Sequence, residues 1–484
     1  MPLRRSTRNR TPAKNGIHSA VPASVKISSA KKRKSKSKSK SKSITTTVPT
    51  PAKFGHFTLE FVDRPLLKEA LSEYEYVSPP KTCCEKLCLI QLWNYTAELY
   101  PEWLAPNSVT FFGYCCSLIV LVMTLNLAPN FPDWYYLLTS FLMFLYQTAD
   151  GSDGPQARRL KCGSALGELF DHGVDAVVTS IIYLVCAEMV GTGITSPLAP
   201  VLFSCTVSAF FFSNASLLHT GRQIFNNFDA QELQVLAQIS LIVTYWFGKE
   251  MWQYKLSMPA FVTTMVKECV PVSFQAALDI NVTESTLELR GFVHMVVMTG
   301  TLINCIHACS VVSKHYSNSE KVAITGRTIS EFWQQVRSML LLFALFGFSW
   351  YVCSTAVSMD ESENHSNTKY AYRLWFISCA FAYADLVNHV LVLRVAKIPM
   401  PSMLRTRSFW LMSLFIIWTE LGNRNVHSII VDYNQMGRFI ICIMCFSSHL
   451  YYSITVGDAI AEGLGVFFFK VPKEKQLAFL KSQK

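Results

Sequence analysis

Long hydrophobic runs, separated by short polar stretches, dominate the chain from about residue 100 onward. A helix that crosses the hydrocarbon core of a bilayer needs about 20 such residues. Ten runs are long enough, or nearly so, and lie near residues 109–128, 132–149, 172–192, 198–218, 230–248, 290–313, 335–356, 371–393, 408–421 and 437–459. The ninth is the weakest. We therefore predict an all-α polytopic membrane protein with about ten transmembrane helices.

The segment before the first run has a different character. Its sequence, CCEKLCLIQLWNYTAELYPEWLAPNSVT, mixes aliphatic, aromatic and polar side chains, which is typical of a helix that lies in the membrane interface. We expect an interfacial amphipathic helix within residues 53–106. A transmembrane domain should then cover residues 107–460, and a cytosolic tail residues 461–484.

Composition agrees with a membrane protein, because 50% of the 484 residues are hydrophobic and only 16% are charged. The net charge of +11 belongs to residues 1–52, which carry 14 Lys and Arg and no Asp or Glu. The tract KKRKSKSKSKSKS predicts a disordered basic tail. It could act as a solvated linker, an arm for anionic lipid or a nuclear or nucleic-acid address. We expect no nucleic-acid partner, because nothing else in the chain supports one.

The loop charges predict an orientation. If the basic tail is cytosolic and the ten helices alternate, basic residues gather in the cytosolic loops and the C-terminal tail: Arg158, Arg159, Lys161, Arg222, Lys314, Lys321, Arg327, Arg394, Lys397, Arg405, Arg407, Lys470, Lys473, Lys475, Lys481 and Lys484. The opposite loops hold the acidic DESENHSN and sequons at Asn281 and Asn364. This positive-inside pattern predicts that both termini are cytosolic.

One stretch interrupts the hydrophobic pattern, TADGSDGPQARRLKCGSALGELFDHGVDA at residues 148–176. Asp150 and Asp153 are three residues apart, and Asp171 and Asp175 are four apart, so each pair shares one face of a helix. The first pair ends one span and the second begins the next. If these two helices lie side by side, four carboxylates converge at the cytosolic face.

Converging carboxylates of this kind need cations. Hard oxygen ligands suit Mg²⁺ or Mn²⁺, and four of them can hold two ions, an arrangement that stabilises phosphoryl transfer. Arg158 and Arg159 follow directly, and a guanidinium group matches the geometry of a phosphate. Five glycines would let a large ligand approach the backbone: Gly151, Gly154, Gly163, Gly167 and Gly173. The residues alone predict a metal-dependent site for a phosphorylated substrate. Ordinary surface salt bridges would explain any single Asp, but not the set.

The stretch resembles the signature of the CDP-alcohol phosphotransferases, D-x2-D-G-x2-A-R, eight residues, G-x3-D-x3-D. The fixed positions are filled by Asp150, Asp153, Gly154, Ala157, Arg158, Gly167, Asp171 and Asp175. The stretches QARR, LGELFDHG and PEWLAPNSVT, and the number of spans, are similar to the choline/ethanolamine phosphotransferase branch. The likeness covers about residues 70–460.

The resemblance implies a reaction, in which CDP-choline or CDP-ethanolamine and diacylglycerol give phosphatidylcholine or phosphatidylethanolamine and CMP, the last step of the Kennedy pathway. It implies that the four motif aspartates bind two Mg²⁺ or Mn²⁺ ions. It also implies substrate-binding roles for Arg158 at the nucleotide phosphates, Asn107 near the cytidine nucleotide, and Gly154, Ala157 and Gly167 in the motif. We expect an integral membrane protein of the endoplasmic reticulum or Golgi, surrounded by membrane lipids, with a homodimer as an option.

Histidine has the intrinsic pKa that suits removal of the acceptor's hydroxyl proton. The resemblance implies His172 as the proton acceptor, and Glu168, one turn earlier, would orient it or position a substrate. Alternatively, His172 only neutralises a neighbouring aspartate. His219, at the end of the fourth span, is a second candidate. We expect Asp385 and His389 in the eighth span to be a packing pair.

Two departures from the branch and two alternative functions remain. Ala215 to Leu218 stand where the branch often has acidic or aromatic residues, which leaves the head-group contacts and the choice between choline and ethanolamine open. Pro155 stands where the branch often has Lys, but the motif leaves this position free, so we expect catalysis to be intact. A second enzyme class would join CDP-diacylglycerol to inositol, serine or glycerol phosphate. A divalent-cation transporter is the non-enzyme alternative, but its carboxylates should be spread along a pathway at the midplane of the bilayer.

Overall fold

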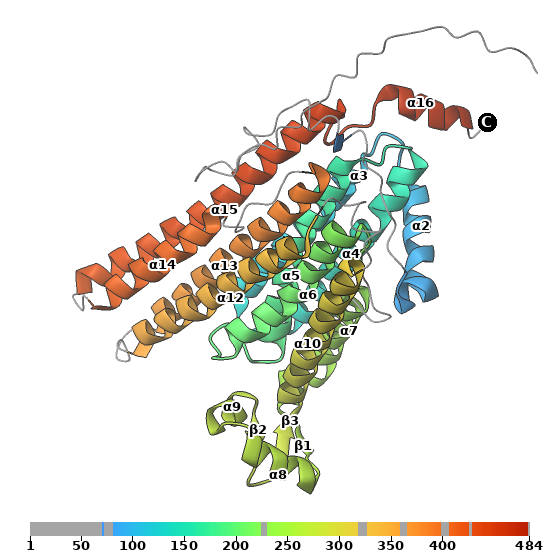
Figure 1. Cartoon of the computed structure of the whole chain (residues 1–484). Helices are drawn as coiled ribbons and strands as arrows, with labels where there is room; N and C mark the ends of the chain where they lie inside the picture. The colour runs from blue at the N-terminus through green and yellow to red at the C-terminus, as the bar shows by residue number, and fades with distance from the viewer. Residues whose placement is uncertain are drawn as a thin grey trace, which may run out of the picture. The chain divides into compact units, whose positions relative to one another are not determined.

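The structure is a computed structural model of the chain, and it describes residues 70–71, 81–223, 230–317, 327–358, 365–397, 406–424 and 428–482. The predicted basic tail and the sequon at Asn364 lie outside the described residues. The described residues form one unit of packed helices, shown in Figure 1.

Each of the ten predicted hydrophobic runs is helical, which confirms the fold class. The corresponding helices are α3 (Pro106–Leu127), α4 (Asp133–Arg159), α5 (Ala165–Met189), α6 (Ala199–Thr220), α7 (Ala230–Phe247), α10 (Leu289–Tyr316), α12 (Ile329–Ser358), α13 (His365–Val395), α14 (Arg407–Arg424) and α15 (Ser428–Leu464). A shorter helix, α16 (Lys473–Ser482), follows at the C-terminal end.

Seven of these helices are long and apolar enough to cross a membrane in the part of the chain that the structure describes, namely α3, α5, α6, α10, α12, α13 and α15. The helices α4 and α7 do not reach this limit of length and apolarity. Some of their polar side chains are hydrogen-bonded to each other between the two helices. Gln147 Nε2 donates to Gln231 Oε1 at 2.8 Å, and Gln147 Oε1 accepts from Gln238 Nε2 at 2.9 Å. Helices paired in this way can span a membrane at lower hydropathy. The crossings by α4, α7 and the 18-residue α14 stay predictions.

The predicted amphipathic segment is also helical, as η2 (Glu85–Leu89) followed by α2 (Ile90–Leu99). Trp93 and Ala97 are buried, whereas Tyr95 and Leu99 are exposed. Trp93 lies so close to α4 that a Cβ added to Gly151 would be 2.1 Å from its Cε2 atom. One face of α2 therefore docks on α4, and its place in the membrane interface stays a prediction.

Between α7 and α10 the structure contains a small sheet that the all-α prediction missed. The strands of this sheet are β1 (Lys255–Ser257), β2 (Ile280–Asn281) and β3 (Thr286–Glu288), and the same region contains the short helices η3 (Lys249–Gln253), α8 (Ala260–Cys269) and α9 (Val272–Ala277). The strands are antiparallel in the order β1-β3-β2, with Leu287 opposite both Leu256 and Ile280. Strands of two or three residues are too short for a hydrophobic alternation to reveal them. The sequon residue Asn281 is exposed in β2.

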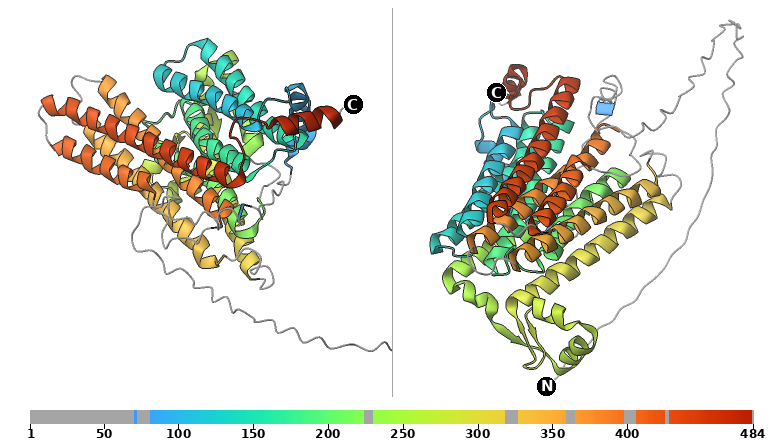
Figure 2. Two further views of the ribbon diagram at one scale, coloured as in Figure 1. Left: turned by 90° about the horizontal axis from the view of Figure 1, so that it is seen from above. Right: turned by 90° about the vertical axis from the view of Figure 1, so that its left-hand side faces the viewer.

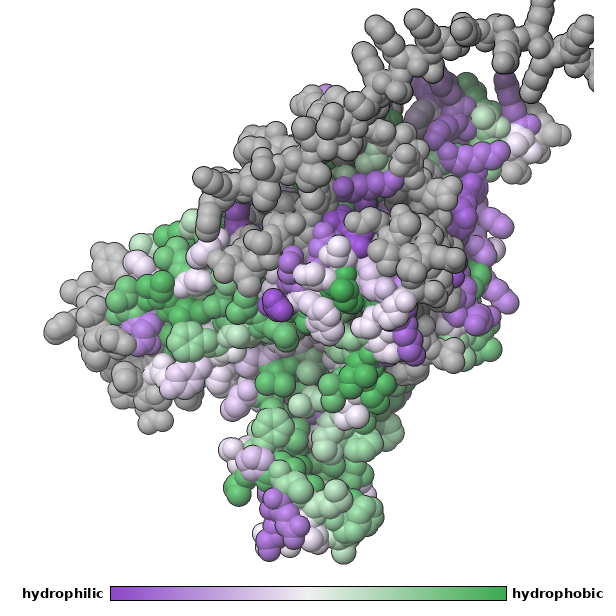
Figure 3. Space-filling view, in the orientation of Figure 1, coloured by the Kyte–Doolittle hydropathy of each residue, from purple (hydrophilic) through white to green (hydrophobic). Residues whose placement is uncertain are grey.

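The helix α13 forms the centre of the packing, since 94% of the most apolar 18 residues within Tyr370–Val395 are buried. It packs against α5, α6, α12, α14 and α15, and α5 also contacts α3. In both views of Figure 2, the C-terminal helices lie beside helices from the N-terminal half. Figure 3 shows hydrophobic side chains over the flank formed by α14 and α15, while hydrophilic ones gather near α2. The helix α5 thus lies between the two halves of the chain.

Candidate active site

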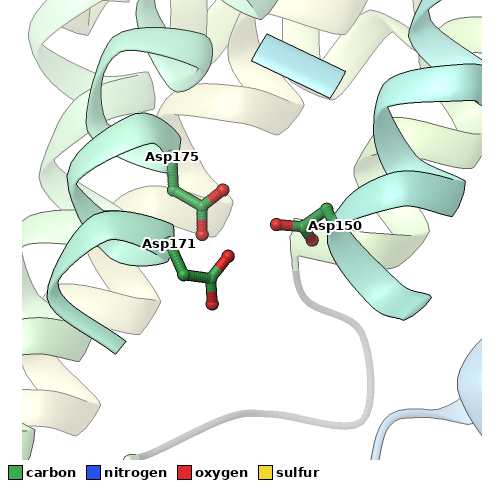
Figure 4. A group of neighbouring side chains, drawn as sticks. All are labelled: Asp150, Asp171 and Asp175. Atoms are coloured by element: carbon green, nitrogen blue, oxygen red, sulfur yellow. The ribbon is translucent and has the colours of Figure 1, made fainter. Parts of the chain in front are cut away.

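The charged stretch folds as the end of one helix and the start of the next. The helix α4 continues through the motif to Arg159, and the backbone N–H of Cys162 then donates to the Ala157 carbonyl at 2.9 Å. Lys161 adopts a left-handed conformation with φ 52°. Ser164 caps α5 and accepts a hydrogen bond from the Gly167 N–H at 3.2 Å, as expected for a serine N-cap. This tight connection lets the end of α4 and the start of α5 face each other across a space (Figure 4).

Three carboxylates meet across this junction. Asp150 on α4 and Asp171 and Asp175 on α5 each offer an oxygen, and the three oxygens lie within 4.8 Å of one another. Figure 4 shows the three groups pointing into the space between the two helices. The Oδ1 atom of Asp171 is buried and has no hydrogen-bond partner among the described residues. Like charges this close favour a bound cation, so the cluster is suited to hold a metal ion.

The fourth predicted ligand, Asp153, lies one turn after Asp150 but outside this cluster of three. Its carboxylate accepts a hydrogen bond from the hydroxyl of Thr110 on α3. The structure therefore brings three of the four predicted carboxylates together and holds the fourth against a neighbouring helix.

Tyr146 is a member of the site that the sequence did not suggest. Its hydroxyl donates to Asp175 Oδ1 at 2.5 Å, and the side chain is buried. Tyr146 lies one turn before Asp150 on α4, and this i, i+4 spacing is the signal that could have identified it. The phenol links the carboxylate of α5 to α4.

His172 is held by a residue from a third helix. Its Nδ1 lies 3.0 Å from Oδ1 of Asn214 on α6, and the Nδ2 of Asn214 donates to the Phe210 carbonyl at 2.9 Å. Because Asn214 presents its oxygen, Nδ1 of His172 must be the donor, which leaves Nε2 as the proton acceptor. Asn214 also escaped the sequence analysis, although an amide inside an apolar run is itself a signal.

The other two predicted catalytic residues have different partners. Glu168 forms an ion pair with Arg394 of α13, and it does not bond the ring of His172. His219 is buried and lies 2.6 Å from the Tyr316 hydroxyl through its Nδ1. Its ring also packs edge-on against Phe332. The described contacts of His219 thus lie on α10 and α12, whereas His172 directly follows a residue of the aspartate cluster.

The two arginines of the motif differ in their surroundings. Arg159 Nη1 donates to the carbonyls of Ala97 at 2.8 Å and Tyr100 at 2.7 Å, so it fastens α2 to α4. Arg158 is exposed. A Cβ on Gly154 would lie 3.3 Å from Nη1 of Arg158, so the missing side chain leaves room for the guanidinium group. Arg158 is therefore the better placed of the two to meet a phosphate.

Asn107 lies at the start of α3, near the first turn of α5. A Cβ on Gly167 would be 3.5 Å from its Oδ1, and its Nδ2 donates to the Phe468 carbonyl at 2.9 Å. The amide therefore ties the C-terminal segment after α15 to the edge of the site.

The pKa of the Tyr100 phenol, beside the motif, is shifted by its surroundings. Its hydroxyl lies 2.9 Å from Ser152 Oγ. Burial raises the pKa of the Tyr100 phenol, the hydrogen bond with Ser152 opposes this rise, and the negative charge of Asp153 adds to it. Burial is thus the main reason that the pKa of this phenol is raised, and the charge of Asp153 makes a smaller contribution.

An apolar cavity of about 490 Å³ lies against α5, the helix that carries Asp171 and Asp175. It is lined by α3, α5, α13, α15 and the segment after α15, and α5 contributes Phe170, Gly173, Val174 and Val177. The lining residues Phe111 and Ile454 are exposed on the outside of the helices, so the cavity reaches the surface between α3 and α15. The helix α5 therefore carries carboxylates on one face and lines an apolar cavity with an adjacent face.

Comparison with known proteins agrees with this geometry. Residues 103–270 match the family model of the CDP-alcohol phosphatidyltransferases. The chain is 29% identical to choline/ethanolaminephosphotransferase 1 of Saccharomyces cerevisiae over 285 residues, which are 57% of this chain and 67% of the relative. It is 28% identical to cholinephosphotransferase 1 of Gallus gallus over 275 residues, 55% of this chain and 73% of the relative.

A third relative is the uncharacterized CDP-alcohol phosphatidyltransferase class-I family protein 2 of Dictyostelium discoideum. It is 36% identical over 196 residues, 39% of this chain and 46% of the relative. The chain thus spans about half the length of this relative. The matched residues include the whole aspartate motif.

Proposed function

We propose that this chain, whose residues 103–270 form a domain of the CDP-alcohol phosphatidyltransferase family, transfers phosphocholine or phosphoethanolamine from CDP-choline or CDP-ethanolamine to diacylglycerol. The observation that carries the proposal is the junction at α5, where Asp171 and Asp175 meet Asp150 beside an apolar cavity. A water-soluble nucleotide and a lipid can meet there. The products are a phospholipid and CMP.

The carboxylates of Asp150, Asp171 and Asp175 would hold a divalent cation, Mg²⁺ or Mn²⁺, and Asp153 would complete a site for a second one. The fit rests on the three converging oxygens and on the buried, unpaired Oδ1 of Asp171. When bound, such cations neutralise charge on the pyrophosphate and on the departing CMP.

His172 would accept the proton of the lipid hydroxyl at Nε2, because Asn214 occupies Nδ1. The hydroxyl oxygen forms a bond to the phosphorus that carries choline or ethanolamine. The bond from this phosphorus to the bridging oxygen breaks, and the electron pair leaves with CMP. A positioned general base of this kind contributes roughly 10²- to 10⁴-fold to the rate.

The donor nucleotide would occupy the cytosolic end of α4. Arg158 is exposed and would meet the phosphates, while Gly154, Ala157 and Gly167 border the space beside them. Asn107 would give up its hydrogen bond to the Phe468 carbonyl and form one to a polar group of the nucleotide. The hydrocarbon chains of diacylglycerol would lie in the apolar cavity, which reaches the surface between α3 and α15.

We propose that this site lies on the cytosolic face, which the loop charges favour, and that its membrane is the endoplasmic reticulum. CDP-alcohols are water-soluble and diacylglycerol stays in the bilayer. A site on α5 at the membrane boundary would give access to both.

Purified full-length protein tests the proposal in a radiolabel transfer assay. The protein receives dioleoylglycerol and Mg²⁺ or Mn²⁺, with labelled CDP-choline and CDP-ethanolamine in parallel. We expect label in the lipid, release of CMP and loss of both on chelation. No transfer from either donor by folded protein would overturn the proposal. Transfer from CDP-diacylglycerol to inositol, serine or glycerol phosphate would then identify the alternative enzyme class.

A further inference from the structure

The apolar cavity beside α5 has one polar end, formed by side chains of α13 and α15. Asn388 and His449 are buried, and Tyr452 lies next to them in the lining. Two of their atoms, Asn388 Oδ1 and Tyr452 Oη, are buried without a hydrogen-bond partner among the described residues. The third residue, His449, faces Asp385 instead, with its Nδ1 3.7 Å from Asp385 Oδ1. Unpaired polar atoms are costly in an apolar cavity. They indicate a ligand that is mostly hydrocarbon and carries a few polar groups.

This polar end lies next to the reacting groups. A Cβ on Gly173 would be 3.0 Å from Asn388 Oδ1, so Asn388 touches the backbone of α5 at the residue that follows His172. Asn388 Nδ2 donates to Ser453 Oγ at 3.3 Å. This bond turns the amide so that the oxygen is the atom left for a ligand. The ligand therefore meets an acceptor within one residue of the candidate base.

The orientation of Tyr452 is fixed from behind. Its ring stacks on His389, with the centroids 4.0 Å apart and the planes at 6°. His389 Nδ1 in turn lies 2.7 Å from the backbone carbonyl of Asp385. The histidine that the sequence predicted to be packing thus holds the phenol in place. A tyrosine hydroxyl held in this way offers a donor to the cavity.

Building on the proposed function, we propose that Asn388 and Tyr452 bind the glycerol portion of the acceptor lipid and act as positioning residues. Asn388 Oδ1 accepts the hydrogen bond of the free hydroxyl in the complex that precedes transfer, next to Nε2 of His172, which then takes the proton. Tyr452 Oη donates to an ester carbonyl. The chemical class of the acceptor is thus a neutral glycerolipid with one hydroxyl and at least one ester, whose chains occupy the apolar remainder of the cavity.

Ester recognition provides a sharp test, because a diether glycerolipid has the same chains and hydroxyl but no carbonyl. Wild-type protein is assayed with dioleoylglycerol and with its dioleyl diether analogue in mixed micelles. We expect kcat/KM to favour the ester by about five- to tenfold, the value of one hydrogen bond. In Tyr452→Phe the ester preference should disappear while KM for the CDP-alcohol is unchanged. Asn388→Leu should raise KM for both lipids.

The matched control is Tyr451→Phe, which removes a hydroxyl from the exposed neighbouring ring and should keep the ester preference. A wild-type protein that does not distinguish the lipids, or a Tyr452→Phe variant that still does, would overturn the inference.

A binding assay separates this inference from the proposed function. Displacement of a fluorescent diacylglycerol by the ester and by the diether needs no turnover. If the wild-type protein transfers nothing but Tyr452→Phe loses the ester preference in binding, the inference stands and the proposed function falls. If transfer occurs and binding shows no effect of Tyr452, the inference falls alone.

Discussion

Asp171 shows how the site differs from its surroundings at the scale of single residues. The carboxylates beside it have protein partners, Thr110 for Asp153 and Tyr146 for Asp175. The buried Oδ1 of Asp171 has none in the described part of the chain. The fold therefore leaves this oxygen for a ligand, and repulsion among the three clustered carboxylates remains uncompensated.

Replacing Asp171 by Asn tests this view. We expect Asp171→Asn to lose at least about 100-fold in turnover, because the amide removes a charged oxygen ligand. The same variant should unfold at an equal or higher temperature in EDTA, since one of three repelling charges is gone. Radiolabel transfer and thermal unfolding in detergent measure the two effects. Asp133→Asn, at the exposed start of α4, should change neither. A lower unfolding temperature for Asp171→Asn would show that the carboxylate is structural.

A second prediction concerns the amide that holds His172. In Asn214→Leu, we expect kcat to fall roughly 10- to 100-fold, because the ring loses its orientation and fixed tautomer. KM for the CDP-alcohol should stay within about twofold, because Asn214 contacts the histidine and not the motif of α4. His172→Ala should have the larger effect on kcat. Asn126→Leu makes the same change at the exposed end of α3 and serves as the control. Equal losses in binding and turnover would leave His172 with a positional role and favour His219 as the base.

The sequence predicts some of these residue contacts and not others. The spacings within α4 and α5 predicted that each pair of aspartates shares one helix face, because helix periodicity is local. They could not predict that Asp153 would lie outside the cluster of three. Periodicity could not pair Glu168 with Arg394, because that contact depends on how α5 and α13 pack. Asn214 escaped notice for the same reason, since its role depends on the approach of α6 to α5.

At the scale of elements, α4 illustrates why hydropathy underestimates some helices. Its polar side chains are hidden in helix contacts, such as Gln147 against Gln231 of α7. The ten helices themselves follow from the sequence, because hydrophobic runs of this length leave little choice of structure. The small sheet between α7 and α10 does not, because strands this short depend on tertiary contacts.

The contact between α2 and α4 yields a prediction about stability. Gly151→Ala would place a Cβ 2.1 Å from Trp93, so the buried indole must move. We expect the free energy of unfolding to fall by about 1–3 kcal/mol, as in other overpacked cores. Gly163→Ala is the matched control, because a Cβ there meets nothing within 4 Å. Thermal unfolding of the two variants in the same detergent measures the difference. Equal stability would mean that α2 is not docked on α4 in the membrane.

At the scale of the whole molecule, the connection between α4 and α5 lies at one end of α5, and the loop after α5 lies at its other end. The small sheet follows the C-terminal end of α7. The positive-inside pattern assigns the first side to the cytosol. Lys161 is exposed on that side, and Lys255 is exposed in β1. Two single changes can therefore test the orientation of the entire chain.

We predict that Lys161→Cys is labelled by a membrane-impermeant maleimide in intact, right-side-out microsomes. Lys255→Cys should be labelled only after permeabilisation, because the predicted topology puts β1 on the luminal side. The background replaces the exposed Cys83, Cys88 and Cys269 by Ser. Labelling of both positions without permeabilisation would contradict the topology, and so would the reverse pattern.

The helix α5 borders two solvents. Asp171 and Asp175 face the junction with α4, while Val174 and Val177 line the apolar cavity. If the proposed function holds, the reaction rate therefore depends on two different kinds of substrate concentration. The nucleotide is counted per volume of water, and the lipid is counted per area of bilayer. Adding inert phospholipid at constant diacylglycerol should slow the enzyme by surface dilution, although the bulk concentrations of both substrates are unchanged.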